Sequence, residues 1–245
     1  MPTHQLLARA RGLWEELAGV PVTFAPEGGV RVVVSPESGL CPAGWTGVVL
    51  LGGSVLVTVP SARTAELVRD ALRGWTPETA ATGAIRDVLP VAGVLGPAAL
   101  AYLSGDRFRP AAAAPTGDHL PGGHPALRAL ELAAGDDDAA EAALDEITSP
   151  AFVVRERGEV VAAAGYRIWP HRTAHLSVLT APAARGRGLA RAAASAAVGH
   201  ALAAGLLPQW RARPPASRRV AAALGFEDMG AQLSVELAPG EPGTT

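Results

Sequence analysis

The sequence predicts an α/β protein, and two observations carry that prediction. Stretches with apolar residues at helical spacing alternate along the chain with short β-branched runs that end at glycine or proline. The 245 residues are also 49% hydrophobic, so the chain has enough apolar material to bury a sizeable core. An intrinsically disordered chain is therefore excluded.

The first third of the chain predicts an α/β unit without a chemical motif. A helical stripe of apolar residues covers residues 6–17. Short strands are expected at residues 30–34, 47–51 and 54–59. Ser61 has the residue type and the position to cap the helix that follows the third strand.

A stretch rich in proline, glycine and alanine separates this unit from the rest. Residues 108–125 show no periodicity, which is typical of a linker. We therefore expect a domain boundary near residue 115. The N-terminal α/β domain, of unknown role, would cover residues 1–114, and a second domain would cover residues 115–245.

The second domain is expected to begin with two short helices around a solvated run of three aspartates, residues 136–138. Further strands and helices then alternate. The expected helices are residues 125–134, 139–147, 188–204 and 217–224. The expected strands are residues 151–156, 159–169, 174–180, 206–212 and 232–237.

Charge, cysteine content and hydropathy exclude several classes of protein. The 21 basic and 23 acidic residues give a net charge of −2, whereas a protein that neutralises many phosphates should be far more basic. The single cysteine excludes a disulfide-built scaffold and favours a reducing compartment. No apolar run is long enough to span a membrane, and the first residues do not read as a signal peptide. We expect a cytoplasmic protein that binds neither nucleic acid nor a membrane.

A glycine-rich turn at residues 185–188 carries the strongest chemical signal. It follows an expected strand and opens an expected helix, so its backbone N–H groups and the helix N-terminus suit a phosphate or pyrophosphate. A Walker loop is excluded because the chain has no lysine, and a dinucleotide fingerprint fails because Arg191 replaces the third glycine. An ordinary strand–turn–helix connection with solvated arginines is the alternative interpretation.

The residues around this turn match a known family. The hexapeptide Arg185-Gly186-Arg187-Gly188-Leu189-Ala190 fits the motif Gln/Arg-x-x-Gly-x-Gly/Ala, and Pro182 precedes it at the usual spacing. A later segment from Ser217 ends in Gly225-Phe226. Residues 125–240 thus resemble the GNAT N-acetyltransferase superfamily. They are especially similar to the branch whose members carry an extra N-terminal domain.

The resemblance implies a mixed, mostly antiparallel sheet with flanking helices, in which strands 174–180 and 206–212 splay apart to admit the pantetheine arm of acetyl-CoA. The backbone of Leu179, Thr180 and Ala181 would pair with that arm. The amides of the turn, from Arg185 through Gly186, Arg187, Gly188 and Leu189 to Ala190, would hold the pyrophosphate. Ser217 would either contact the coenzyme or cap a helix.

Acyl transfer from a thioester to an amine needs a base, an oxyanion donor and a departing thiolate. The resemblance implies that the backbone N–H of Leu179 is the oxyanion donor. The family's usual glutamate is missing from the strand before the loop, and His175 is the titratable residue there. His175 is thus the candidate base, with a structural histidine as the alternative interpretation. The family's tyrosine, a general acid, would fall at Ala221.

The sequence therefore predicts an acetyl-CoA-dependent N-acetyltransferase that acts on the primary amine of a small molecule through a tetrahedral intermediate. The alternative is a catalytically degenerate acyl-CoA-binding module with a regulatory or interaction role. No metal is expected, because His119 and His124 are too isolated for a site that needs three or four ligands. We expect the N-terminal domain to wall the acceptor pocket, and a homodimerisation module is the alternative.

Overall fold

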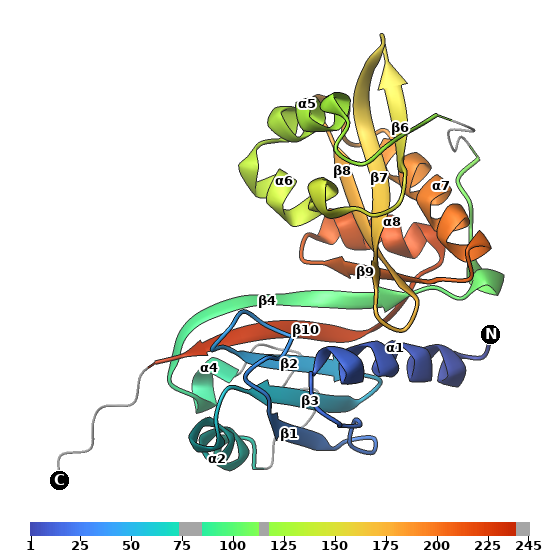
Figure 1. The fold of residues 1–245 in the computed structure, drawn as a ribbon. Helices are drawn as coiled ribbons and strands as arrows, with labels where there is room; N and C mark the ends of the chain where they lie inside the picture. The colour runs from blue at the N-terminus through green and yellow to red at the C-terminus, as the bar shows by residue number, and fades with distance from the viewer. Residues whose placement is uncertain (74–84, 113–117, 239–245) are drawn as a thin grey trace. The chain divides into compact units, whose positions relative to one another are not determined.

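The structure is a computed structural model that describes residues 1–73, 85–112 and 118–238, and these residues form two compact units (Figure 1). One unit comprises Met1 and Ala101–Asp228, and the other comprises Pro2–Leu100 with the chain from Met229 onward. Strands β4 (Val91–Tyr102) and β10 (Glu227–Leu237) each run from one unit into the other. The expected boundary at residue 114/115 lies outside the described residues.

The unit that contains Pro2–Leu100 is built on a mixed sheet with the strand order β1-β3-β2-β10-β4. Strand β1 (Val30–Val34) is parallel to β3 (Ser54–Val59), and β2 (Thr46–Leu51) is antiparallel to both β3 and β10. The helices among the described residues of this unit are α1 (Thr3–Leu17), α2 (Ala62–Ala71) and α4 (Ile85–Val88). As predicted, Ser61 caps α2, and its Oγ accepts a hydrogen bond of 3.2 Å from the Thr64 amide.

Two features of this unit differ from the prediction. Strand β4 falls in a segment for which the sequence predicted no strand, and one proline and two glycines interrupt its apolar pattern. Strand β10 had been expected in the second domain, but from Met229 onward it belongs to this unit. Its residues 230–235 pair with β2, and Leu233 and Val235 enter the core of this unit.

The unit that contains Ala101–Asp228 has a largely antiparallel sheet flanked by helices, as predicted. Strands β5 (His119–Leu120), β6 (Ala151–Glu156), β7 (Glu159–Trp169) and β8 (Thr173–Thr180) pair antiparallel in chain order. Strand β9 (Leu207–Ala212) then joins β8 in parallel. The helices are α5 (Pro125–Ala134), α6 (Asp136–Ala142), α7 (Leu189–Ala203) and α8 (Pro215–Leu224).

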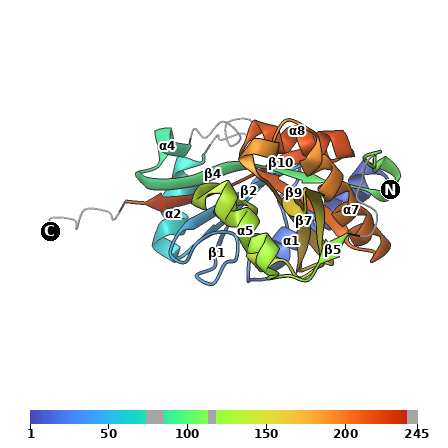
Figure 2. The same ribbon diagram turned by 90° about the horizontal axis from the view of Figure 1, so that it is seen from above.

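Helices cover both faces of these strands, and Figure 2 shows α5 and α7 on opposite sides of β7. Side chains alternate between the faces, as they do in any strand. Ala174 and Leu176 of β8 pack in the core cluster that contains α7 and α8, whereas Leu179 packs with α5. We refer below to the α7 face and the α6 face of β8 and β9.

The three aspartates at residues 136–138 differ from the prediction. They form the first turn of α6 rather than a turn between two helices. Carboxylates are favourable at this end of a helix because the helix dipole is positive there. Within the described residues no helix has the length and apolar character needed to cross a membrane.

Candidate functional site

The strands β8 and β9 separate partway along their length. Their parallel pairing ends at His175 and Gln209, although β8 continues to Thr180 and β9 to Ala212. The splay predicted from the family resemblance is therefore present in the structure. It leaves one edge of the second half of β8 without a strand partner on the β9 side.

A pocket with a volume of about 510 Å³ opens from this gap. Its walls come from the free halves of both strands, the glycine turn, the first turn of α7, and parts of α6 and α8. Every residue that lines it belongs to the unit that contains Ala101–Asp228. The pocket thus has an extended backbone edge along one side and a helix N-terminus at its end.

The glycine turn lies between β8 and α7, where the sequence placed it. Gly186 and Gly188 have φ angles of 76° and 78°, in the left-handed region that glycine adopts without strain. A Cβ atom at either position would meet no other atom within 4 Å, so the space in front of the turn is open. Gly188 precedes α7, and none of the described side chains caps that helix. The first amides of α7 are therefore free to donate to an anion.

The two arginines of the turn are held by carboxylates. Arg185 pairs with Asp138 of α6 at 2.5 Å and donates from Nε to the Thr180 carbonyl. Arg187 makes two hydrogen bonds, of 2.9 and 2.5 Å, to Glu156 of β6, and this pairing holds the pKa of the Glu156 carboxyl below its usual range. Arg187 is not among the residues that line the pocket, and its side chain is engaged by Glu156.

The direction of the β8 amides follows from the ladder with β7. The Ala181 amide donates to the Val161 carbonyl, and amides in an antiparallel ladder alternate sides with a period of two. The amide of Leu179, expected as the oxyanion donor, therefore points toward β7. The amides of Val178 and Thr180 point into the splay instead. The sequence could not give this result, because it depends on the register between the strands.

Several polar atoms around the pocket have unused hydrogen-bonding capacity. Thr180 Oγ1 and Arg191 Nε are buried and have no hydrogen-bond partner among the described residues. Trp210 of β9 donates from Nε1 to Ser217 Oγ at 2.9 Å, which leaves the Ser217 hydroxyl hydrogen for another acceptor. α8 begins after Pro214, and none of the described side chains caps it, so the capping role considered for Ser217 is wrong.

His175 lies on the α6 face and is not among the residues that line the pocket. Its Nδ1 is 2.5 Å from Gln209 Oε1, and its ring stacks on Trp169 with the ring centroids 4.1 Å apart. The pKa of His175 is lowered to about 4, chiefly by burial and then by the charges of Arg211 and Arg167, while the hydrogen bond to Gln209 acts in the opposite direction. The ring is therefore neutral near pH 7. Because an amide oxygen accepts from Nδ1–H, the lone pair resides on Nε2.

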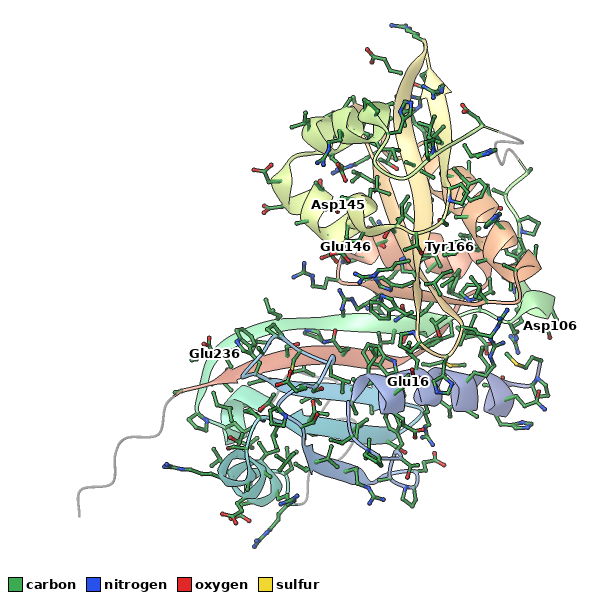
Figure 3. The ribbon with its side chains drawn as sticks, viewed as in Figure 1. Glu16, Asp106, Asp145, Glu146, Tyr166 and Glu236 are labelled. Carbon is green, nitrogen blue, oxygen red and sulfur yellow. The ribbon has the colours of Figure 1, made fainter. Side chains whose placement is uncertain are left out.

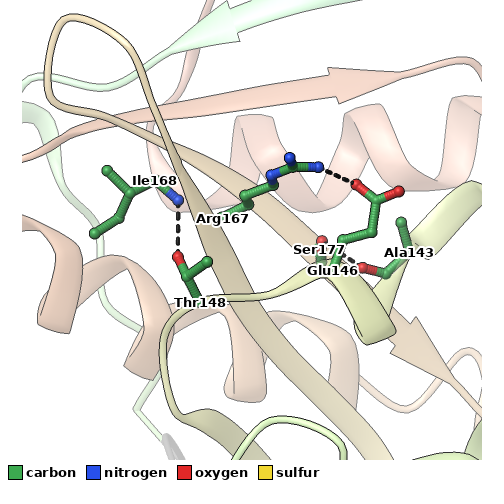
Figure 4. A network of polar contacts seen from close by, with 6 residues as sticks. All are labelled: Ala143, Glu146, Thr148, Arg167, Ile168 and Ser177. Atoms are coloured by element: carbon green, nitrogen blue, oxygen red, sulfur yellow. Dashed lines mark hydrogen bonds and ion pairs between the residues drawn. The ribbon is translucent and has the colours of Figure 1, made fainter.

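The α6 face around His175 is polar. Arg167 Nη1 donates to Glu146 Oε2 over 2.7 Å, and Ser177 Oγ donates to the Ala143 carbonyl. Figure 4 draws both contacts. Glu146 and its neighbour Asp145 come from the short turn after α6, whereas Tyr166 belongs to the α7 face (Figure 3). There the Tyr166 hydroxyl bonds to His200 Nδ1 at 2.8 Å.

These features fit a coenzyme that has a pyrophosphate and an extended amide arm. The open glycine turn and the uncapped helix match the pyrophosphate, and the free edge of β8 matches the amide arm. Over the described part of the chain no group of three or more His, Cys, Asp and Glu side chains is placed to hold a metal ion.

Comparison with known sequences finds one family model that matches part of the chain. Residues 149–231 match the sequence model of the family described as GNAT acetyltransferase. This segment contains both splayed strands, the glycine turn and α8. The resemblance to the GNAT superfamily is therefore confirmed. No curated protein sequence matches the chain significantly.

Solved structures of similar proteins carry the same family name. A protein from Novosphingobium aromaticivorans assigned to the GNAT family is 24% identical over 59% of this chain and 65% of its own, with a TM-score of 0.44. A GCN5-related N-acetyltransferase from Kribbella flavida is 18% identical over 61% of each chain, with a TM-score of 0.45. An acetyltransferase from the GNAT family of Colwellia psychrerythraea is 16% identical over 97% of this chain and 98% of its own, with a TM-score of 0.49. This chain thus spans less than two thirds of the first two relatives.

Proposed function

We propose that this chain, whose residues 149–231 match the GNAT acetyltransferase family model, transfers an acetyl group from acetyl-CoA to the primary amine of a small molecule. Membership of the family supports an acyltransferase. We further propose that the acyl donor is acetyl-CoA and that the acceptor is an amine.

One observation carries the proposal: the pairing of β8 and β9 stops at His175 and Gln209, and the gap beyond ends at the glycine turn. An extended amide chain can add to the free edge of β8 as a further strand would. The amide of Thr180 would donate to that chain. The turn amides and the N-terminus of α7, which carries roughly half a positive charge, would hold the pyrophosphate.

We assign the oxyanion donor to the Val178 amide, in place of the Leu179 amide expected from the sequence. The ladder with β7 directs the amide of Val178 into the splay. Val178 also lies beyond His175, the last residue of β8 that pairs with β9. A preorganised amide in a water-poor gap stabilises the developing negative charge strongly. The thioester of acetyl-CoA would supply the acyl carbon at this end of the pocket.

His175 is our candidate for the base that removes the proton from the amine. Its Nε2 lone pair is available near pH 7 because the ring is neutral, and Gln209 and Trp169 fix the orientation of the ring. General base catalysis needs both the correct protonation state and the correct position. The low pKa makes His175 a weak base, so transfer of the proton through water to solvent would complete the step.

The thiolate would leave without a protein acid. Ala221, where the family's tyrosine would fall, is buried in the core cluster of the α7 face and carries no proton to donate. A thiol with a pKa of about 8.5 is a fair leaving group without prior protonation.

Two measurements test the proposal. Isothermal titration of the purified protein with acetyl-CoA should show binding, and a thiol-release assay over a panel of amines should show turnover with at least one of them. Binding without turnover on any amine would favour the alternative of a degenerate acyl-CoA-binding module. No binding at millimolar acetyl-CoA would contradict both interpretations.

A further inference from the structure

Arg211 lies at the rim of the pocket on the α6 face. Its neighbours on β9, Trp210 and Ala212, are buried in the core cluster of the α7 face. Because side chains alternate along a strand, Arg211 points to the opposite face, where its exposed side chain borders the pocket. His175 lies on this same face, since its β9 partner is Gln209, two residues before Arg211.

The positive charge of Arg211 is not neutralised by an ion pair. Glu141 and Glu146 are the acidic groups whose charges act on it. Each of them is already held at short range by another arginine, Glu141 by Arg213 and Glu146 by Arg167. Within the described residues Arg211 forms no hydrogen bond or ion pair of its own.

We infer that Arg211 binds the carboxylate of the acceptor, so that the acceptor is an amine that also carries a carboxylate, as an amino acid does. A guanidinium binds a carboxylate through two parallel hydrogen bonds, and this geometry would orient the molecule. With the carboxylate on Arg211, the amine of the acceptor faces His175 on the same side of the splay. The inference rests on the proposed function and names the substrate class for it.

A phosphate would offer a guanidinium the same hydrogen-bonding chemistry as a carboxylate. The test therefore includes an aminophosphate beside the aminocarboxylates.

The test compares matched acceptors on the full chain. Turnover is measured with the common amino acids, β-alanine and γ-aminobutyrate, with the carboxamide of each, and with phosphoethanolamine. The carboxamides keep the amine and remove only the negative charge. We expect the best aminocarboxylate to exceed its carboxamide by about 10- to 100-fold in kcat/KM, as a charge-assisted hydrogen bond provides.

Variants assign this preference to Arg211. Arg211→Gln should reduce kcat/KM for the aminocarboxylate by about 10- to 100-fold relative to kcat/KM for its carboxamide, which reports any change at His175 that both acceptors share. Arg211→Lys should restore part of the preference, since it keeps the charge but not the paired hydrogen bonds. Arg218→Gln is the matched control. Arg218 pairs with Asp228 on the exposed side of α8 and does not line the pocket, so the same loss of charge there should not change the preference.

The outcomes separate this inference from the proposed function. Turnover of aminocarboxylates and carboxamides at equal rates, or a preference that survives Arg211→Gln, overturns the inference alone. Preference for phosphoethanolamine that depends on Arg211 assigns the site to a phosphate and overturns the carboxylate. If no amine turns over, titration of the same panel into protein saturated with CoA decides. Aminocarboxylate binding that Arg211→Gln removes supports the inference while refuting catalysis, and the lack of such binding overturns both.

Discussion

The imidazole of His175 lies nearly parallel to the indole of Trp169, with the ring centroids 4.1 Å apart and an interplanar angle of 11°. The side-chain oxygen of Gln209 accepts a hydrogen bond from Nδ1 of the same imidazole. Contacts from β7 and β9 together thus fix the orientation of the ring. The ring lies on the α6 face, the same face as Arg211 of β9. Both the stack and the low pKa make His175 the residue with the clearest consequences for experiment.

The stability of the protein should decrease when the pH falls from about 6.5 to about 4. The pKa of His175 is about 4 in the folded state and 6.5 as its ordinary value, so in this window the unfolded chain binds a proton that the folded chain does not. The stability from this group is present above pH 6.5 and is lost toward pH 4. Thermal unfolding at pH 7 and pH 5 measures it. The drop in Tm should be larger in the wild-type protein than in His175→Gln, and equal drops would contradict the shifted pKa.

Removal of the His175 imidazole should slow catalysis without weakening coenzyme binding. We expect His175→Gln to lower kcat by about 100-fold, which is at the lower end of general base catalysis. The KM for acetyl-CoA should stay the same, because His175 does not line the pocket. His119→Gln, at an exposed position on β5, is the control. A His175→Gln enzyme that keeps its full rate would leave His175 with a structural role only.

A side chain in the glycine turn should block the pyrophosphate. Gly188→Ala places a Cβ in the open space before α7 and strains a backbone with a φ of 78°. Gly158→Ala is the matched control. Gly158 has a φ of 88°, and a Cβ there would also meet no atom within 4 Å, but this glycine lies in the β6–β7 hairpin and not in the glycine turn. Both changes should cost about 1–2 kcal/mol of stability. Only Gly188→Ala should weaken acetyl-CoA binding in a calorimetric titration, and equal affinities in the two variants would count against the proposed anion site.

Residues 101–228 alone should bind acetyl-CoA, because they contain every residue that lines the pocket. A chain of residues 115–245 should behave worse. It keeps the part of β10 that pairs with β2 but lacks β2, so Leu233 and Val235, which are 2% and 0% exposed in the full chain, would face solvent. Gel filtration and titration with acetyl-CoA compare the two chains. A soluble, binding-competent 115–245 chain beside an unfolded 101–228 chain would contradict this division.

The local parts of the site could be predicted from the sequence because their signals are local. The backbone of the turn is left-handed at both of its glycines, a conformation that glycine adopts without strain. The helix that follows begins at Leu189, as the alanine-rich pattern indicates. The strands at residues 159–169 and 174–180 were likewise visible as β-rich runs between turns. Hydrophobic periodicity and turn chemistry act over a few residues, so they can be read without knowing what packs against them.

The partners of the site residues are set by contacts between distant parts of the chain. Asp138 was expected to be solvated, yet it pairs with Arg185, 47 residues away, and Arg187 is held by Glu156, 31 residues away. The contact between His175 and Gln209 spans 34 residues and exists only because β8 and β9 pair in parallel up to that point. No local pattern encodes such pairings.

The sequence by itself determined that this chain has an α/β fold with a glycine turn between a strand and a helix, because the signals for both are local. The tertiary structure alone decided which amides of β8 enter the splay, where β10 pairs, and that Arg211 stands beside the pocket with no carboxylate paired to it among the described residues. The physical reason is register. A shift of one residue turns every amide and side chain of a strand to the other side, and the register is fixed only when the whole sheet is assembled.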